Sequence, residues 1–247
     1  MKKDHFSRQS DLYLQFRPGY PEALFAKIAD AAPDTKLAVD LACGNGQAAV
    51  GLANYFEEVV GLDGSAGQIR VALARPNIRY SVASAEATGL ADHCASVVTV
   101  AQALHWFDLE AFWPELKRIL RLKGLFVAWS YALMEINPDI DRIWLHFYRE
   151  TLRDTWPPDR AHVEEGYRNL GLPDWINRWP GFELVESWTR EQFVGYVRTW
   201  SGVKRFQDRY GYDPSVPFDR DLASAWPDGE IRTVRWPLHV FWGRPNG

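Results

Sequence analysis

The chain has 247 residues, a length that suits one large α/β domain or a domain with a substantial insertion. Hydrophobic residues make up 47% and charged residues 24%, which are ordinary values for a globular protein and argue against intrinsic disorder. The net charge of −4 gives no general attraction to nucleic acid or to an anionic membrane. We therefore expect a small-molecule partner, with no nucleic acid, no membrane and no obligate protein partner.

Cysteine usage and the terminal segment indicate a reducing compartment. Cys43 and Cys94 are the two cysteines, and they form no metal-ligand spacing with histidine, so we expect free thiols and no metal site. The first ten residues lack the apolar core of a secretory signal, and the longest apolar stretch, 124–134, is too short to span a bilayer. These features predict a cytoplasmic protein.

An aromatic segment stands ahead of the first regular element, within residues 1–34. It combines Tyr13, Arg17 and Tyr20 with rigid turn residues, and the helix expected over 21–31 has proline in its first turn. Such a segment can fold over a ligand as a lid, or it can pack on the surface as an N-terminal arm.

The stretch LAVDLACGNGQ, residues 37–47, predicts a buried strand that runs into a glycine turn. Asp40 places a carboxylate near the end of the strand, and Gly44 and Gly46 follow where a tight turn begins. A second strand ends in Asp63, 17 residues after Gly46, which leaves room for one helix. The spacing favours a βαβ unit that binds a nucleoside-containing ligand. The turn also fits the GxGxxA form of a dinucleotide-binding loop, with Asp63 as the ribose ligand.

Apolar runs predict seven strands in all. We expect them at residues 37–41, 58–62, 78–83, 95–102, 124–131, 182–188 and 231–242. The first of these alternate with helices, which indicates an α/β fold with a doubly wound, mostly parallel sheet. A helix capped by Asp108 is expected to kink or restart at Pro114, because proline lacks a backbone donor.

The alternation of strand and helix stops near residue 133. We expect one domain over 1–247, with a ligand-binding core at 35–132, helical cap insertions at 133–180 and 190–230, and a final strand within 231–247. Insertions of this length in compact domains are usually functional lids or caps.

The tryptophans divide the chain into two halves. All 12 lie at position 106 or later, which favours a substrate pocket walled by Trp106, Trp144 and Tyr148. The alternative is that these rings bury the underside of the insertions.

Four short motifs occur in order along the core. They are Asp40-Leu41-Ala42-Cys43-Gly44-Asn45-Gly46, Asp63-Gly64-Ser65 with Gln68, Ser84-Ala85-Glu86, and Gln102-Ala103-Leu104-His105-Trp106-Phe107. Together they resemble class I S-adenosylmethionine-dependent methyltransferases, whose first motif is acid-x-Gly-x-Gly-x-Gly. Ala42 replaces the first glycine, and the loop 121–124 lacks the family's usual Pro-Gly-Gly. Arg17 to Pro21 and the Gln102 to Phe107 segment look closest to the type 11 branch, which includes trans-aconitate methyltransferase-like enzymes.

The resemblance implies a Rossmann-like methyltransferase fold, S-adenosylmethionine as the cofactor and a small-molecule acceptor, with a carboxylic acid among the options. It implies a cofactor site made of Tyr13, Arg17, Asp40, Ala42, Gly44, Gly46, Asp63, Gly64, Gln68, Ala85, Glu86, Gln102 and Ala103. Substrate contacts are expected from Tyr20, Trp106, Trp144 and Tyr148.

A sulfonium methyl is already activated, so the protein's task is to align a nucleophile with it and to exclude water. His105 is a candidate to accept the proton of a hydroxyl or amine, or to orient the substrate, and a structural histidine is the alternative. Two other functions stay open: an NAD-dependent oxidoreductase and a non-catalytic S-adenosylmethionine-binding protein.

Overall fold

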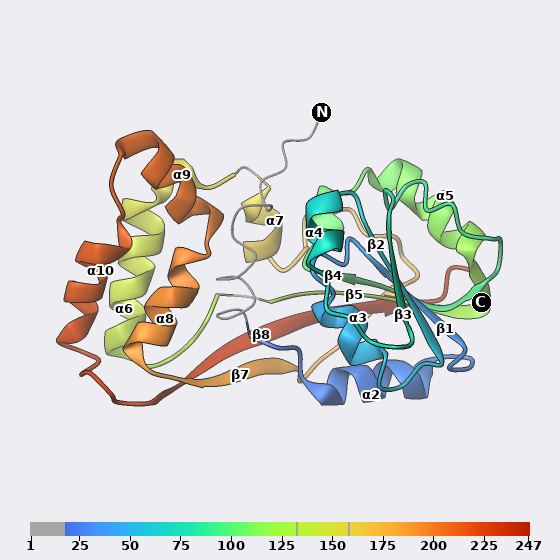
Figure 1. Cartoon of the computed structure of the whole chain (residues 1–247), viewed down its shortest axis with the longest axis horizontal. Helices are drawn as coiled ribbons and strands as arrows, with labels where there is room; N and C mark the ends of the chain where they lie inside the picture. Colours follow the sequence, from blue (N-terminus) through green and yellow to red (C-terminus); the bar gives the residue numbers. More distant parts are fainter. Residues whose placement is uncertain (1–17, 132, 158) are drawn as a thin grey trace. The chain divides into compact units, whose positions relative to one another are not determined.

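A computed structural model describes residues 18–131, 133–157 and 159–247 (Figure 1). Tyr13 and Arg17 of the expected cofactor site lie outside these residues. The chain forms two compact units. We call residues 19–132, 162–183 and 237–247 the sheet unit, and residues 133–161 and 184–236 the helical unit.

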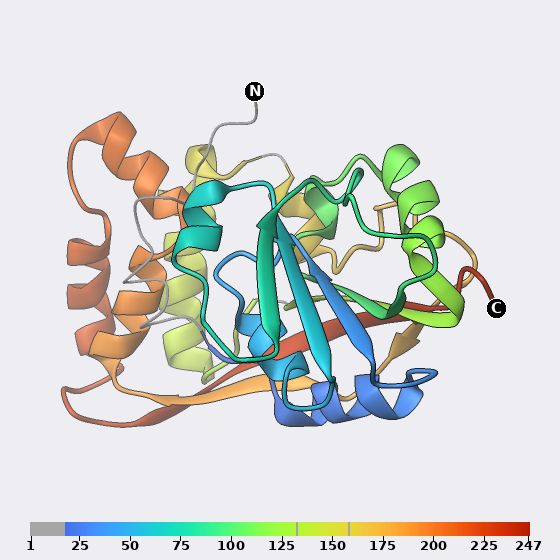
Figure 2. The ribbon, with the colours of Figure 1, turned by 45° about the vertical axis from the view of Figure 1, so that its right-hand side comes forward.

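The sheet has eight strands in the order β3-β2-β1-β4-β5-β8-β6, with β7 paired to β8. Their bounds are β1 Leu37–Leu41, β2 Glu58–Asp63, β3 Ile78–Val82, β4 Ala95–Ala101, β5 Leu120–Tyr131, β6 Ile176–Trp179, β7 Glu183–Trp188 and β8 Arg232–Gly243. The strands β1 to β5 pair in parallel, and β8 runs antiparallel to β5 and β6. Figure 2 shows β1, β2 and β3 side by side. The predicted doubly wound, mostly parallel fold is confirmed.

Strand β6 adds an eighth strand that the sequence pattern did not predict. It falls inside the range expected to be a cap insertion, and its four residues, Ile-Asn-Arg-Trp, carry no strong alternation of polarity. Its pairing with β8 makes it a strand, and that partner lies more than fifty residues further along the chain. The polarity pattern of four residues cannot indicate a partner strand that lies so far along the chain.

Helices cover both faces of β5. In the sheet unit the helices are α2 Glu22–Ala31, α3 Gln47–Leu52, α4 Ala66–Arg70, the 3-10 turn η1 Leu104–Trp106 and α5 Leu109–Ile119. Phe25 of α2 packs edge-on against Trp129, and Phe112 of α5 packs against Phe126. Because Phe126 and Trp129 are three residues apart on one strand, they point to opposite faces. Helix α2 therefore covers one face and α5 the other.

The helix α5 is continuous through Pro114, so it does not restart there, and the expected kink stays a prediction. Proline removes the amide that would have bonded the carbonyl of Glu110. Glu110 is exposed, so water can satisfy that carbonyl. Asp108 caps the helix as expected, with its side chain accepting the amide of Ala111.

The helical unit contains α6 Pro138–His146, the π turn η2 Phe147–Thr151, the 3-10 turn η3 Arg153–Thr155, α8 Arg190–Arg198, α9 Ser201–Tyr210 and α10 Ser215–Ala223. The short helix α7, Arg160–Glu164, begins in the last two residues of the segment 133–161 and ends in the sheet unit. Aromatic side chains fill the interior of the helical unit: Phe147 stacks on Phe218 at 4.3 Å between ring centroids, and Trp226 and Trp236 are fully buried. In the part of the chain that the structure describes, no helix is both long and apolar enough to cross a membrane.

Candidate functional site

The turn after β1 carries three residues with positive φ. Ala42 has φ +51°, Gly44 +55° and Gly46 +88°. The loop is tied to β2, because the amide of Cys43 donates to the carbonyl of Leu62 at 3.0 Å. Ala42 takes the left-handed conformation that the family's glycine would adopt freely, at a cost of about 1–2 kcal/mol for a residue with a Cβ. The one irregular position of the motif thus keeps a glycine-like backbone.

Asp63 joins the ends of β1 and β2. Its Oδ2 accepts the amide of Gly44 at 2.8 Å, and its Oδ1 accepts the amide of Ser65 at 2.8 Å. Ser65 in turn caps α4, where its hydroxyl accepts the amide of Gln68 at 3.4 Å. One carboxylate therefore positions the glycine turn and the following helix together. The neighbouring Gly64 is exposed, with open space where a side chain would stand.

Asp40 lies beneath the turn and is completely buried. Its Oδ1 accepts the hydroxyl of Thr99 at 2.8 Å, while Oδ2 has no hydrogen-bond partner among the described residues. Burial raises the pKa of Asp40 to about 7, hydrogen bonding from the Thr99 hydroxyl and the Ala49 backbone opposes the rise, and the charge of Asp63 adds to it. Asp40 is therefore poised to change its ionisation near neutral pH.

Tyr80 is a residue of this site that the sequence analysis missed. Its ring lies against Gly46 and Gly61: a Cβ on Gly46 would be 2.1 Å from the Tyr80 hydroxyl, and one on Gly61 2.5 Å from the ring. The hydroxyl donates to the carbonyl of Leu73 at 2.9 Å. The two glycines thus make room for Tyr80, which supports the turn from behind. A tyrosine in register with a glycine on the adjacent strand is the signal that could have identified it.

The segments after β3 and β4 close the same edge of the sheet. Glu86 accepts the amide of Asp108 at 3.0 Å, which links the loop after β3 to the loop after β4. Gln102 has φ +56°, and its amide donates to the carbonyl of Trp129 at 2.8 Å. Ala85 and Ala103, on these two loops, are buried. The motifs at residues 84–86 and 102–107 therefore lie at the same edge of the sheet as the motifs that contain Asp40 and Asp63.

His105 lies in η1, directly after β4. Its Nδ1 is 3.1 Å from the hydroxyl of Tyr167, and its ring lies 5.1 Å from that of Trp106. Trp106 is half-buried against the main hydrophobic cluster of the sheet unit. Tyr167 was also missed, because it lies 62 residues from His105, in a stretch without regular periodicity.

Tyr20 lies in the sheet unit, against the carboxyl end of β5. Its ring meets that of Trp129 edge-on at 5.3 Å. Trp129 is fully buried, and its indole Nε1 has no hydrogen-bond partner among the described residues. A buried donor without a partner is uncommon in a folded protein and is compatible with a ligand that accepts from it.

The two other expected substrate contacts, Trp144 and Tyr148, belong to the helical unit. Trp144 is 1% exposed and donates from its indole to Asp141 at 2.8 Å, and Tyr148 is 3% exposed and accepts from Nε of Arg160 at 2.8 Å. Both side chains form part of that unit's interior, as the alternative interpretation of the tryptophans expects. Their role in substrate binding stays a prediction.

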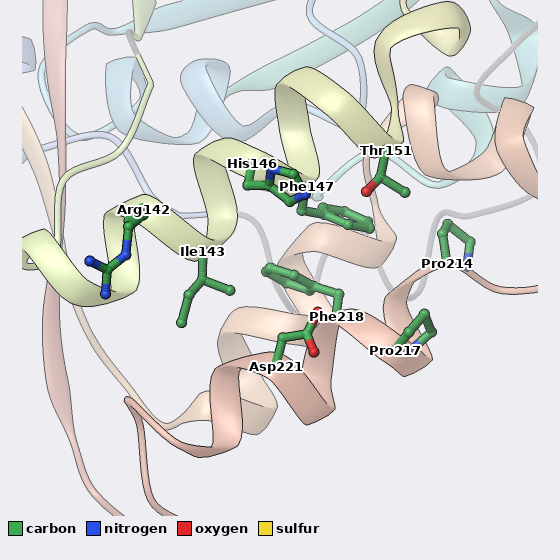
Figure 3. Close-up of a pocket in the computed structure, with 9 residues that line it drawn as sticks. All are labelled: Arg142, Ile143, His146, Phe147, Thr151, Pro214, Pro217, Phe218 and Asp221. Atoms are coloured by element: carbon green, nitrogen blue, oxygen red, sulfur yellow. The ribbon is translucent and has the colours of Figure 1, made fainter.

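The helical unit also has a cavity of its own, of about 350 Å³, between α6, η2 and α10 (Figure 3). Its walls include the stacked rings of Phe147 and Phe218, with Arg142, His146 and Asp221 at its edge. None of the residues expected from the sequence to bind cofactor or substrate lines it. Among the described residues, no cluster of histidine, cysteine, aspartate or glutamate could hold a metal ion.

Comparisons with known proteins give one consistent result. A family model described as a methyltransferase domain, of type 11, matches residues 39–128. A Dictyostelium discoideum protein named as a methyltransferase is 34% identical over 248 residues, which span 96% of this chain and 94% of the relative. A solved structure from Anaeromyxobacter dehalogenans, described as a type II methyltransferase, has a TM-score of 0.85 at 41% identity and covers 93% of this chain and 98% of its own. The (4+2)-cyclase SpnF, with a TM-score of 0.53 at 15% identity over 98% of this chain and 95% of its own, shares the fold alone.

The polar groups at the edge of the sheet fit the cofactor of this family. A carboxylate has about four lone-pair positions, so each oxygen of Asp63 can accept a ribose hydroxyl besides its amide. The buried Oδ2 of Asp40 is an acceptor beside which a cationic ligand is favoured. The cofactor is therefore S-adenosylmethionine, and the chain belongs to the class I S-adenosylmethionine-dependent methyltransferases.

Proposed function

We propose that this enzyme transfers the methyl group of S-adenosylmethionine to a small-molecule acceptor. The observation that carries the proposal is the double role of Asp63, which accepts the amides of Gly44 and Ser65 and so fixes the turn where the nucleoside would lie. The acceptor classes to be compared are carboxylic acids, phenols and amines. Carboxylic acids are included because the motifs resemble the trans-aconitate branch.

Each motif has a proposed role in holding the cofactor. Asp63 would hold the ribose hydroxyls, Ala85 and Glu86 would border the adenine, and Gln102 and Ala103 would border the methionyl end. Asp40 would favour the positive charge of the ligand from beneath the turn. Gly44, Gly46, Gly64 and Gln68 would shape the cradle, and Arg17 and Tyr13, outside the described residues, would close it.

When bound, S-adenosylmethionine supplies an activated methyl group. The protein's own residues would then need only to orient the acceptor and exclude water, which can contribute about 7–11 kcal/mol to lowering the barrier. His105 would take up the proton of a hydroxyl or amine acceptor. The residues that would contact the acceptor are Tyr20, Trp106, Trp144 and Tyr148.

The proposal is tested by a methyl-transfer screen. Purified protein is incubated with S-adenosylmethionine and small carboxylic acids, phenols and amines, and release of S-adenosylhomocysteine is measured. We expect release that requires both the acceptor and the intact Asp63, with Asp63→Ala as the inactive control. Tight cofactor binding without release for any acceptor would contradict methyl transfer and support the non-catalytic alternative.

A further inference from the structure

Two hydrogen-bond donors in the sheet unit are buried without a partner among the described residues. One is the indole Nε1 of Trp129, a fully buried residue near the carboxyl end of β5. The other is the side-chain Nε2 of Gln102, which directly follows β4. A buried donor without an acceptor costs free energy, so two of them on neighbouring strands call for an explanation.

The backbones of the two residues are in direct contact. The amide of Gln102 donates to the carbonyl of Trp129 at 2.8 Å, and Ala101, just before Gln102, pairs in register with Trp129. Gln102 has φ +56°, a strained conformation for a residue with a Cβ, and such strain is often found at ligand sites. Both side chains therefore start from one point at the carboxyl edge of the sheet.

Trp129 lies on the face of the sheet that carries Asp40. Thr99, whose hydroxyl bonds Asp40, is two residues before Ala101 on β4, and alternate residues of a strand share a face. The hydroxyl of Ser130 also has no partner among the described residues, but Ser130 is next to Trp129 and so points to the opposite face. The indole is therefore on the side of the sheet where the buried acid of the cofactor cradle lies.

Two donors without an acceptor favour a ligand group that only accepts. An ionised carboxylate has two oxygens with about four lone-pair positions and no proton, so it can accept from both donors and still turn a lone pair toward a methyl carbon. A hydroxyl or an amine brings donors of its own, and a phenol, with a pKa of about 10, keeps its proton at neutral pH. Hydrogen bonds to a charged group are also the stronger kind.

We propose that the indole N–H of Trp129 and the side-chain amide of Gln102 donate to a carboxylate of the methyl acceptor, so that the product is a methyl ester. This inference rests on the proposed function and selects one acceptor class from it. In the step, a lone pair of one carboxylate oxygen forms a bond to the methyl carbon, and the carbon–sulfur bond breaks with its pair left on sulfur. No proton is released, so no base is required.

The surroundings of Trp129 fit a bound carboxylate. Its ring meets that of Tyr20 edge-on at 5.3 Å, so a group held by the indole would lie near a residue that the sequence predicts to contact the acceptor. Full burial excludes water, which strengthens the hydrogen bonds but makes an unpaired charge costly. The sulfonium of the cofactor, when bound, supplies the opposite charge, so the acceptor's carboxylate is not buried without a counter-ion.

The first test is proton–nitrogen NMR of the Trp129 indole in the full-length protein saturated with S-adenosylhomocysteine, which requires no methyl transfer. Acetate is the probe, and acetamide is its neutral match. We expect acetate alone to move the indole proton of Trp129 downfield in a saturable way. The internal control is Trp236 of the helical unit, which is fully buried with an indole unpartnered among the described residues and should not respond. An unmoved Trp129 signal, or equal shifts with acetamide, overturns the proposal.

The second test uses variants to separate the acceptor's carboxylate from that of the cofactor. Gln102→Leu removes one donor and should raise the acetate concentration that half-saturates the Trp129 shift at least about 10-fold, as expected for a hydrogen bond to a charged group. Trp129→Phe should bind S-adenosylhomocysteine in calorimetry as tightly as the matched control Trp236→Phe. A larger loss of affinity in Trp129→Phe would assign the indole to the cofactor's own carboxylate and overturn the proposal.

The third test is the chemistry of the product from the methyl-transfer screen. Dilute alkali cleaves a methyl ester to methanol, whereas methyl ethers and methylamines resist it. We expect the transferred methyl to be released as methanol, and Trp129→Phe to lower kcat/KM for the acceptor at least about 10-fold relative to Trp236→Phe. An alkali-stable product overturns this inference while confirming methyl transfer. If no product forms, the proposed function fails, and the acetate titration still decides whether the two donors bind a carboxylate.

Discussion

The amide of Gly44 and the carboxylate of Asp63 meet at 2.8 Å, although 19 residues separate them in the sequence. Gly44 lies in the turn after β1, and Asp63 is the last residue of β2. This hydrogen bond fixes the position of the glycine turn relative to Asp63, the acid that would hold the ribose. The first two family motifs therefore depend on each other for their geometry.

Replacing Asp63 with alanine should remove both the turn's anchor and the ribose ligand. Hydrogen bonds to a charged group contribute about 1.5–3 kcal/mol each, so we expect the affinity for S-adenosylmethionine to fall at least about 10-fold. Isothermal titration calorimetry measures the change. The control is Glu58→Gln, which removes a charge at the exposed start of the same strand, where it pairs with Arg79. Similar losses in both variants would contradict a specific role for Asp63.

Gly46 should tolerate a side chain less well than Gly44. Both have positive φ, so alanine strains the backbone at either position, but only at Gly46 does the new Cβ meet the Tyr80 hydroxyl, at 2.1 Å. We expect Gly46→Ala to lower the free energy of unfolding by about 1–3 kcal/mol more than Gly44→Ala, the usual cost of overpacking. Urea denaturation of the two variants measures the difference. Equal destabilisation of the two variants would show that the Tyr80 hydroxyl does not limit the space at Gly46.

Asp40 should make the stability of the protein depend on pH. Its pKa is about 7 in the folded state against an ordinary value of 3.8, so between these values the folded state holds a proton that the unfolded state has lost. The stability that Asp40 contributes is fully present below pH 3.8, and it is lost as the pH rises through about 7. Asp40→Asn, which keeps the shape without the charge, should therefore gain stability relative to the native protein as the pH rises.

Thermal unfolding of native protein and Asp40→Asn at a series of pH values from about 5 to 8 measures this effect. The difference in melting temperature should grow with pH in favour of the variant. Thr99→Val, which removes the hydroxyl that bonds Oδ1, is a second probe: it should raise the pKa of Asp40 further, because that bond favours the ionised form. A pH-independent difference for Asp40→Asn would mean that Asp40 is ionised throughout the range.

The core of the fold was predictable because its signals are local. The strand Leu37–Leu41 has the predicted bounds, and the second strand, expected at 58–62, extends by one residue to Asp63. Each is a short apolar run with an acid at or next to its last residue and a glycine within the three residues that follow the strand, so burial and turn chemistry identify it without tertiary information. The motif residues Asp40, Gly44 and Asp63 are brought together by the parallel pairing of these two strands.

Most of the features that the sequence did not predict depend on distant partners, and one depends on exposure to solvent. Ile176–Trp179 is a strand only because β8 pairs with it, and Pro114 is accepted inside α5 because the carbonyl it leaves unpaired is on an exposed residue. Tyr80 and Tyr167 act through contacts with Gly46 and His105 that lie far away in the sequence. Such residues are defined by packing, and their type alone does not reveal them.

The central claim is that this protein moves a methyl group from S-adenosylmethionine onto a separate small molecule. The most direct measurement is mass spectrometry of an acceptor pool after incubation with the protein and S-adenosylmethionine labelled with carbon-13 in its methyl group. We predict one acceptor that gains the labelled methyl in step with S-adenosylhomocysteine release, and no labelled product with Asp63→Ala. Cofactor that binds and stays intact, with every acceptor unlabelled, would contradict the claim.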